Sequence, residues 1–520
     1  MKPAAAWCLT VLFLLAIFSV PLVQVAMELH RGQRPTVLAL FNRLPTREHL
    51  RTFEETLETT SAPRTTVQPY LQLAATQWGG FGNTKVVLGR DGWLFYSPGV
   101  ELVTGRGILD PNRLRQRVKD RVNAGEPDFH PDPRPAIRQF AETCRQHGAT
   151  LLLMPVPDKA MLQPAELDGR ADPGDPAPPP RNPDHAKFLA EMEAQGIEIL
   201  DLTPPLIAPG EVRFLVQDTH WTPEWMDAAA QSLARRLQGR LSSASTTAEL
   251  ALQPQSVSRL GDLVDMLRLP SWQRVFLPQT VTVQGVVDRR TRLPWQARAD
   301  ADVLLLGDSF ANVYSLEVMG WGDAAGLVEH LAFHLGRPVD RIVRNDHGAW
   351  ATRQALAEEY ARGKDRLKGK KVVVWEFAAR ELMVGNWKPM TIELGHPPPS
   401  RFVVPAAGQP ARVTARLEAI ARAPRPGTVP YKDHIVALHI SEIESDNARI
   451  NGGQAVVYAW SMRNNVWTDA ARWLPGRRVA LVLRPWAEVQ GKLDAVNRAE
   501  LPDDALMYEE PCWAEELVEP

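Results

Sequence analysis

The fold can be inferred from one stretch, Ala301-Asp302-Val303-Leu304-Leu305-Leu306-Gly307-Asp308-Ser309-Phe310. Its apolar run has no polar alternation, which is typical of a strand buried on both faces in a helix-covered parallel sheet. Open parallel sheets bind ligands beyond the carboxyl ends of their strands, so Ser309 is expected at a functional edge. The plainer alternative is a strand-to-helix turn in which Asp308 or Ser309 only caps the next helix.

A second motif, Asp218-Thr219-His220-Trp221, precedes this stretch and supplies an acid and a base. Asp218 and His220 are two residues apart, so an extended or tightly turned backbone directs both side chains to one side. With Ser309 they make up a nucleophile, a base and an orienting carboxylate. His220 could instead be a packed core residue or a metal ligand. Zinc needs three or four ligands, however, and no His-rich or Cys-rich spacing lies near Asp218, so we expect neither a metal nor a cofactor.

Short apolar runs alternate with helix-like stretches through the middle of the chain. This alternation predicts an α/β fold with a doubly wound parallel sheet. The expected strands are 150–156, 197–202, 303–306, 341–343 and 371–377, and the expected helices are 135–147, 223–237 and 352–364. Two interruptions are expected as well: a proline-rich surface loop at 172–183, and a segment at 246–298 without clear periodicity that could wall a substrate groove.

A second domain is expected after Met390, where Pro397-Pro398-Pro399 ends the α/β pattern. Strand-like runs follow at 411–420, 435–443, 455–462 and 479–486. They predict a small β-barrel or OB-like module whose role is structural or carbohydrate-binding. The predicted domains are residues 1–30 (membrane anchor or signal), 31–80 (stalk), 81–395 (catalytic domain) and 396–520 (β-rich domain).

An apolar leader opens the chain, because no charge interrupts it from Ala5 to Met27. About twenty such residues span a bilayer. We favour an uncleaved N-terminal transmembrane helix over a cleaved signal, since Gln24-Val25-Ala26 is a poor small-X-small cleavage site. Lys2 on one side and Arg31 and Arg34 on the other do not fix its orientation.

Composition is compatible with these predictions and excludes some others. At 520 residues and 44% hydrophobic content, the chain can build two or three cores. A formal net charge of −2 provides no basic surface for nucleic acid. The three cysteines, Cys8, Cys144 and Cys512, form no metal motif, and because Cys8 lies in the leader at most one disulfide is expected.

The two motifs together resemble the SGNH-hydrolase-like domain of the alginate O-acetyltransferases of the AlgJ and AlgX type. Two further stretches share the resemblance, Val86-Val87-Leu88-Gly89-Arg90-Asp91-Gly92-Trp93-Leu94-Phe95-Tyr96 and Pro155-Val156-Pro157-Asp158-Lys159-Ala160. As in that family, and unlike ordinary SGNH esterases, the Asp-X-His motif precedes the serine. The resemblance implies Ser309 as nucleophile, His220 as base and Asp218 as orienter. It also implies export, a polysaccharide acceptor, and a membrane-bound O-acyltransferase as the acetyl-donating partner.

Further residues are weaker candidates for the same site. Asn345 and Gly348 are candidate oxyanion donors beside the Ser309 backbone N–H, although a plain turn also explains them. Lys159 could contact a substrate carboxylate or simply be solvated. Aromatic rings pack on sugars, and the tryptophans expected nearest the site are Trp221, Trp321 and Trp350. Glu376 and Arg380 are expected to pair with each other at (i, i+4).

The sequence thus predicts an exported O-acetyltransferase that accepts acetyl on Ser309 and passes it to a hydroxyl of an exopolysaccharide, as in alginate biosynthesis. The expected location is the inner membrane with the catalytic domain in the periplasm, or the periplasm alone if the leader is cleaved. Two alternatives stay open. One is a secreted carbohydrate or lipid acetyl esterase, and the other is a non-catalytic polysaccharide-binding scaffold.

Overall fold

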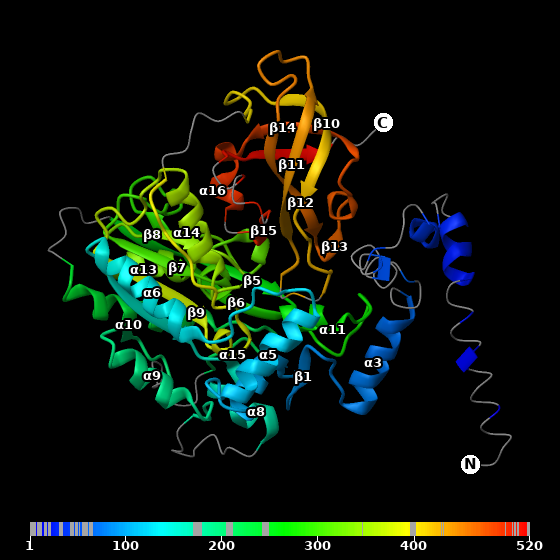
Figure 1. Cartoon of the computed structure of the whole chain (residues 1–520). Helices are drawn as coiled ribbons and strands as arrows, with labels where there is room; N and C mark the ends of the chain where they lie inside the picture. Colours follow the sequence, from blue (N-terminus) through cyan, green and yellow to red (C-terminus); the bar gives the residue numbers. More distant parts are fainter. Residues whose placement is uncertain are drawn as a thin grey trace. The chain divides into compact units, whose positions relative to one another are not determined.

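The computed structural model describes residues 66–169, 179–203, 212–241, 249–345, 347–395 and 402–516, apart from 428, 430, 495, 502, 504–505 and 507–508. Before residue 66 it describes residues 7, 13–14, 18, 22–30, 35–41, 46, 50, 53–54 and 61. The chain, drawn in Figure 1, divides into two units. One consists of Met1–Asn83 with Leu267–Phe276, and the other of Thr84–Met266 with Leu277–Pro520.

The first unit contains the 3-10 helix η1 (Thr36–Phe41) and the helix α3 (Gln68–Gly79). α3 ends at Gly80, whose φ of 66° is a left-handed conformation that glycine adopts without strain. Most of the predicted leader, residues 5–27, lies outside the described residues. Among the helices of the described part, none is both long and apolar enough to cross a membrane, and the predicted transmembrane helix stays a prediction.

A five-stranded parallel sheet lies in the second unit, in the order β4-β3-β9-β7-β8. Its strands are β3 (Thr150–Val156), β4 (Glu198–Ile199), β7 (Val303–Gly307), β8 (Asp340–Val343) and β9 (Val372–Ala378). β7 and β9 are buried along their whole length, as predominantly apolar runs predict, and β9 buries Glu376 as well. β4 is shorter than expected because Asp201 turns the chain, its Oδ1 accepting a hydrogen bond from the Thr203 N–H at 2.9 Å.

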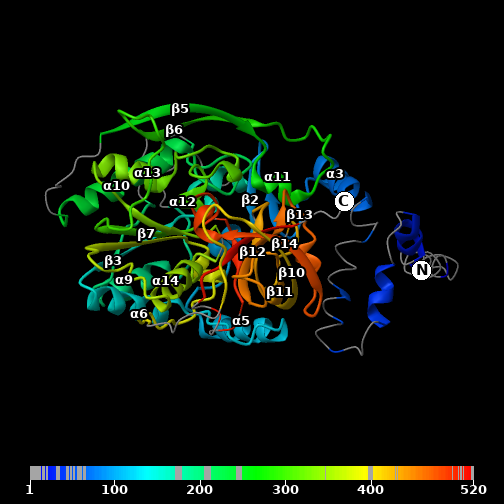
Figure 2. The same cartoon turned by 90° about the horizontal axis from the view of Figure 1, so that it is seen from above.

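Helices cover both faces of this sheet, which confirms the predicted α/β architecture (Figure 2). One face carries α10 (Pro223–Gln238) and α13 (Leu327–Leu335), and the other carries α6 (Pro133–Gln146), α9 (His185–Glu193) and α14 (Ala351–Ala361). α6 and α10 begin as their sequences suggest, each with a proline in the first turn. The side chains of Asp132 and Thr222 cap them by accepting backbone N–H bonds.

Short elements connect these layers. They are β1 (Val86–Leu88), β2 (Leu94–Tyr96), α4 (Ser97–Thr104), α5 (Pro111–Asn123), α7 (Lys159–Leu162), α8 (Pro164–Asp168), α11 (Asp262–Leu267), α12 (Ser309–Asn312), η3 (Glu317–Met319) and α15 (Glu381–Val384). The segment at 246–298, which showed no clear periodicity, contains the antiparallel pair β5 (Leu250–Arg259) and β6 (Gln279–Asp288). Most of the predicted loop at 172–183 lies outside the described residues.

A five-stranded barrel follows toward the C-terminus, as predicted, with its own hydrophobic core. The closed ring is β12-β16-β14-β10-β11, because β11 also pairs with β12. Its strands are β10 (Ala411–Ile420), β11 (His434–Glu444), β12 (Ala455–Arg463), β14 (Arg478–Pro485) and β16 (Cys512–Glu516). Smaller elements are β13 (Val466–Trp467), η4 (Ala470–Arg472), η5 (Trp486–Glu488), α16 (Gln490–Leu493) and β15 (Arg498–Ala499).

Cys144 and Cys512 are both free and lie in different hydrophobic cores. The single disulfide that the sequence left open is therefore not formed between them.

Candidate active site

The carboxyl edge of the parallel sheet gathers the predicted site residues. Ser309 directly follows the Gly307-Asp308 turn at the end of β7, Asp158 follows β3, and Arg380 follows β9. The turn at Gly307 leaves no room for a side chain, because an added Cβ would lie 2.8 Å from the Ala311 Cβ. Parallel strands present their ends at one edge, so these residues meet although they are far apart in the sequence.

Asp308 does cap the following helix, so the plainer reading of the motif is also found. Its Oδ1 accepts a hydrogen bond from the Phe310 N–H at 2.8 Å, and its Oδ2 accepts one from the Ala378 N–H at 2.7 Å. A carboxylate with both oxygens engaged fixes the turn that carries Ser309. Capping by Asp308 and a chemical role for Ser309 are thus compatible.

Asp218 and His220 form the pair that their spacing predicts. His220 Nδ1 lies 2.6 Å from Asp218 Oδ1, and both side chains are buried. The carboxylate can only accept, so Nδ1 carries the proton and Nε2 holds the lone pair. His220 Nε2 is itself buried and has no hydrogen-bond partner among the described residues.

Phe310, the residue after Ser309 in the chain, contacts this histidine. The ring of His220 packs edge-on against the ring of Phe310, with centroids 5.0 Å apart. Tyr314, further along the same segment, donates its hydroxyl to the Trp221 carbonyl at 2.6 Å. His220 Nε2 makes no hydrogen bond to Ser309 in this structure. The hydrogen bond between a nucleophile and its base is often long or poorly aligned until substrate binds.

Two residues that the sequence did not assign to the relay hold Asp218 in place. The indole Nε1 of Trp321 and the backbone N–H of Asp262 each donate to Asp218 Oδ2 at 2.9 Å. Burial raises the pKa of Asp218, but the hydrogen bond and charge of His220 and the Asp262 amide outweigh it, so that the pKa is lowered. The Asp218 carboxylate therefore stays ionised and oriented toward His220.

Asp262 is a second buried acid beside the pair, 4.0 Å from His220 Nδ1. Burial and the nearby Asp218 charge raise the pKa of Asp262 to about 7. Its Oδ1 and Oδ2 accept hydrogen bonds from the N–H and hydroxyl of Thr219, at 2.8 and 2.6 Å. Asp218, His220 and Asp262 could in principle ligate a metal ion, but these hydrogen bonds account for the cluster without one.

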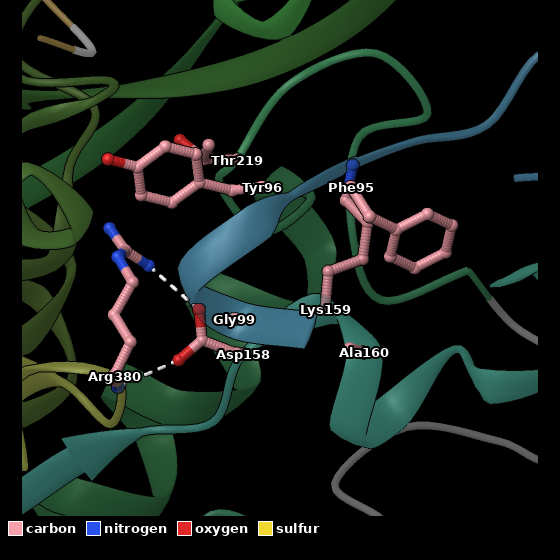
Figure 3. Close-up of a pocket in the computed structure, with 8 residues that line it drawn as sticks. All are labelled: Phe95, Tyr96, Gly99, Asp158, Lys159, Ala160, Thr219 and Arg380. Carbon is pink, nitrogen blue, oxygen red and sulfur yellow. Dashed lines mark hydrogen bonds and ion pairs between the residues drawn. The ribbon is translucent and has the colours of Figure 1, made fainter. Parts of the chain in front are cut away.

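A small pocket lies beside the relay. Its lining residues come from three stretches that carried the resemblance, together with Gly99 of α4 and Arg380 after β9 (Figure 3): Phe95, Tyr96, Gly99, Asp158, Lys159, Ala160, Thr219 and Arg380. The Arg380 guanidinium lies 5.4 Å from the ring centre of Tyr96 and equally far from that of Phe310. The pocket is therefore lined by Thr219, the chain neighbour of His220, and by Arg380, which contacts Phe310, the chain neighbour of Ser309.

Arg380 pairs with Asp158, and the expected pairing with Glu376 is wrong. Asp158 Oδ1 accepts from Arg380 Nη1 at 2.9 Å, and its Oδ2 accepts from the Arg380 backbone N–H at 2.8 Å (Figure 3). Glu376 points instead toward the turn before Ser309, where its Oε2 accepts the Asp308 N–H at 2.8 Å. An (i, i+4) contact requires a helix, whereas Glu376 lies inside the strand β9 and Arg380 lies beyond its end.

Lys159 is buried, so the prediction that it could be solvated is wrong. Its Nζ donates to the carbonyls of Leu94 and Val216, at 2.8 and 3.3 Å. Burial lowers the pKa of this amine to about 7. In this structure the amine ties β2 to the loop before Asp218, and contact with a substrate carboxylate stays a prediction.

The candidate oxyanion residues lie near the serine turn. Asn345 Oδ1 accepts from Asn312 Nδ2, on the short helix that Ser309 begins, at 2.8 Å. Gly348 packs against Asp308 so closely that an added Cβ would lie 3.0 Å from Asp308 Oδ2. Both are close enough to the turn to keep an oxyanion role as a prediction.

Two of the three tryptophans proposed to stack on sugar are inaccessible. Trp221 and Trp321 are 0% and 1% exposed, and the first packs against Phe310 while the second binds Asp218. Trp350, at the start of α14, is half-buried and remains a candidate.

Known proteins match the part of the chain that contains these site residues. Residues 86–379 match the family model ALGX, described as the SGNH hydrolase-like domain of acetyltransferase AlgX. This match covers more than half of the chain, and the protein belongs to that family of acetyltransferases. The predicted family and the predicted enzyme class, O-acetyltransferase, are confirmed.

Similar proteins from Pseudomonas species are named as members of the same type of acetylase. The chain is 27% identical over 317 residues to a probable alginate O-acetylase AlgJ of Pseudomonas putida, which covers 59% of this chain and 72% of that one. A probable AlgJ of Pseudomonas syringae pv. tomato is 27% identical over 235 residues, about half of its own length.

Solved structures are similar over comparable spans. The O-acetyltransferase domain of P. putida AlgJ is 25% identical, covers 58% of this chain and 93% of that domain, and has a TM-score of 0.41. AlgX of Pseudomonas aeruginosa is 16% identical, with coverages of 77% and 90% and a TM-score of 0.39.

Proposed function

We propose that the protein transfers acetyl groups to hydroxyls of an exported polysaccharide, with Ser309 as nucleophile, His220 as base and Asp218 as orienter. The supporting observation is the state of the histidine. Its Nδ1 is held by Asp218 at 2.6 Å, while its Nε2 is buried, unpartnered among the described residues, and beside the neighbour of Ser309. Relatives named as alginate O-acetylases make alginate the first acceptor to test.

The chemistry divides into two half-reactions. In the first, His220 Nε2 takes the hydroxyl proton of Ser309 as Oγ bonds to the acetyl carbonyl carbon. The donor's leaving group departs with that proton, and Ser309 becomes an acetyl ester. In the second, a sugar hydroxyl gives its proton to Nε2 and attacks the ester carbonyl. The acetyl group moves to the sugar oxygen, and Ser309 recovers its proton.

We assign the pocket beside Arg380 to the acetyl group, because its lining includes Thr219, the chain neighbour of His220, and Arg380, whose guanidinium lies 5.4 Å from the ring centre of Phe310, the chain neighbour of Ser309. The polymer would then lie outside the pocket, within reach of the half-buried Trp350. Developing negative charge on the acetyl oxygen needs donors, for which the Ser309 backbone N–H, Asn345 and the Gly348 turn are our candidates.

The location and partner are proposed on the family resemblance. The catalytic domain, residues 81–395, would face the periplasm beside the membrane, with the β-rich domain, residues 396–520, attached to it. A membrane-bound O-acyltransferase would hand acetyl to Ser309. Tethering both to one membrane raises the local concentration for this handover. Reporter fusions after Arg34, one active only in the cytoplasm and one only in the periplasm, test this. A cytoplasmic signal would overturn it.

The reaction itself can be tested with the purified full chain in mild detergent. We would supply an activated acetyl ester with oligomannuronate, with cello-oligosaccharide, or with no acceptor, and measure both free acetate and acetylated sugar by mass spectrometry. Acetylated oligomannuronate that disappears in Ser309→Ala supports the proposal. Acetate alone, whatever the acceptor, would indicate an esterase. Neither product would indicate a polysaccharide-binding scaffold.

A further inference from the structure

Two histidines and an aspartate converge between α10 and α13, away from the relay. Asp227 Oδ1 lies 2.6 Å from His330 Nδ1 and also 2.6 Å from His334 Nε2. The three ligand atoms all lie within 4.8 Å of one another. His330 and His334 are four residues apart on α13, a spacing that puts both rings on one face of a helix.

The hydrogen bonds of His330 show an arrangement suited to a metal. Its Nε2 lies 2.9 Å from the Gln284 carbonyl oxygen, which can only accept, so Nε2 carries a proton. A neutral ring then has its lone pair on Nδ1, the atom that faces Asp227. A backbone carbonyl that holds the far nitrogen of a ring is the usual support of a metal-bound histidine.

This carbonyl contact also leaves a mismatch that a cation would resolve. With a lone pair on Nδ1, His330 and the Asp227 carboxylate are two acceptors facing each other at 2.6 Å. A proton held by either group, or a cation bound by both, would resolve this contact.

We propose that Asp227, His330 and His334 bind one divalent transition-metal ion of the zinc type. Two imidazoles and one carboxylate are the ligands that zinc prefers, and water would complete the tetrahedron. Ligand atoms about 2 Å from a tetrahedral ion are about 3.3 Å apart. Asp227 therefore has to withdraw by less than about 1 Å. Its side chain is 41% exposed, which leaves it free to do so and gives the ion access.

The ion would join the two segments that carry the relay. α10, which bears Asp227, begins three residues after His220. α13, which bears both histidines, is tied to the segment after Ser309, because Glu329 Oε2 accepts the Ser315 hydroxyl at 2.7 Å. The metal would thus cross-link α10 and α13 and would have a structural role, without contact to substrate. This role does not depend on the acceptor or on transferase chemistry.

Zinc binding to the full chain tests the proposal. We would strip the purified protein with a chelator, titrate zinc against a chromophoric competitor, and record the visible spectrum after cobalt substitution. The expected result is one equivalent per chain, a tetrahedral cobalt spectrum, and a Tm that zinc raises by a few degrees. His334→Gln, chosen because His334 is partly exposed, should weaken binding at least about tenfold, as should Asp227→Asn.

Two controls separate this site from other histidines. His130→Gln removes an exposed histidine that also contacts an aspartate, at 2.9 Å, and should leave zinc binding unchanged. His220→Gln removes the histidine of the relay, and this variant should likewise still bind one equivalent of zinc per chain. Absence of bound zinc would overturn the proposal and leave a proton shared between Asp227 and His330 as the explanation of their contact. Zinc binding that is unaffected by His334→Gln and Asp227→Asn would also overturn it.

Discussion

Trp321→Phe should slow the reaction while the protein stays folded, because the indole N–H is a donor to the relay carboxylate. The substitution removes one hydrogen bond, from Trp321 Nε1 to Asp218 Oδ2 at 2.9 Å, and keeps an aromatic ring in the same space. A hydrogen bond to a charged group contributes about 1.5–3 kcal/mol. If this energy orients Asp218 in the transition state, kcat falls about 10-fold to 100-fold.

Trp387→Phe is the matched control for this prediction. Trp387 is also fully buried and also makes one indole hydrogen bond, to the Glu381 carbonyl at 3.0 Å. Each substitution should cost about 1–3 kcal/mol of stability from lost packing. Urea unfolding measures this loss, and release of acetate from an activated ester measures kcat. We expect a large kcat loss only in Trp321→Phe. A folded Trp321→Phe enzyme with the wild-type kcat would refute the reasoning.

Three further predictions follow from the same geometry. Because Asp262 has a pKa of about 7, the folded state binds a proton that the unfolded chain loses above about pH 4. Stability should therefore fall as pH rises from about 4 to 7, and Asp262→Asn should flatten this slope in urea unfolding; an unchanged slope would contradict the assignment. Gly307→Ala should lower both Tm and rate, since its Cβ would lie 2.9 Å from Glu376 Oε2, and wild-type values for both would show that the turn can adjust. Asp218→Asn should reduce kcat strongly, whereas His220→Ala should approach complete loss; full activity in His220→Ala would exclude it as the base.

The sequence predicted the parts of the site that depend on local pattern. The apolar run before Ser309 became a buried strand, and the spacing of Asp218 and His220 gave their 2.6 Å contact. The barrel could be predicted for the same reason, since alternating strands and turn residues are local signals. Its last strand, β16, escaped notice because it is short and pairs with strands from earlier in the chain.

Contacts between distant segments could not be predicted. Trp321 was expected near the site as a sugar-stacking ring, but its role depends on a hydrogen bond to a residue 103 positions away. Asp262 supplies its amide from a segment that showed no periodicity. Lys159 was expected to be solvated or to contact substrate. Its actual partners, the carbonyls of Leu94 and Val216, could not be predicted because a sequence does not show which backbone carbonyls will face an amine. Such roles depend on which groups the fold leaves unpaired.

The central claim is that Ser309 is the nucleophile. The most direct test compares acetyl-enzyme formation in the wild-type protein and in the Ser309→Ala variant. Replacing the hydroxyl opens little space, so the variant should match the wild type in Tm. We would mix each protein with an activated acetyl ester, measure the mass of the intact chain at short times, and locate any acetyl group by peptide mapping. The account predicts a transient acetyl group on Ser309 in the wild type, none at that position in the variant, and a rate about 10⁴-fold to 10⁶-fold lower. Unchanged turnover in a folded Ser309→Ala protein would contradict it.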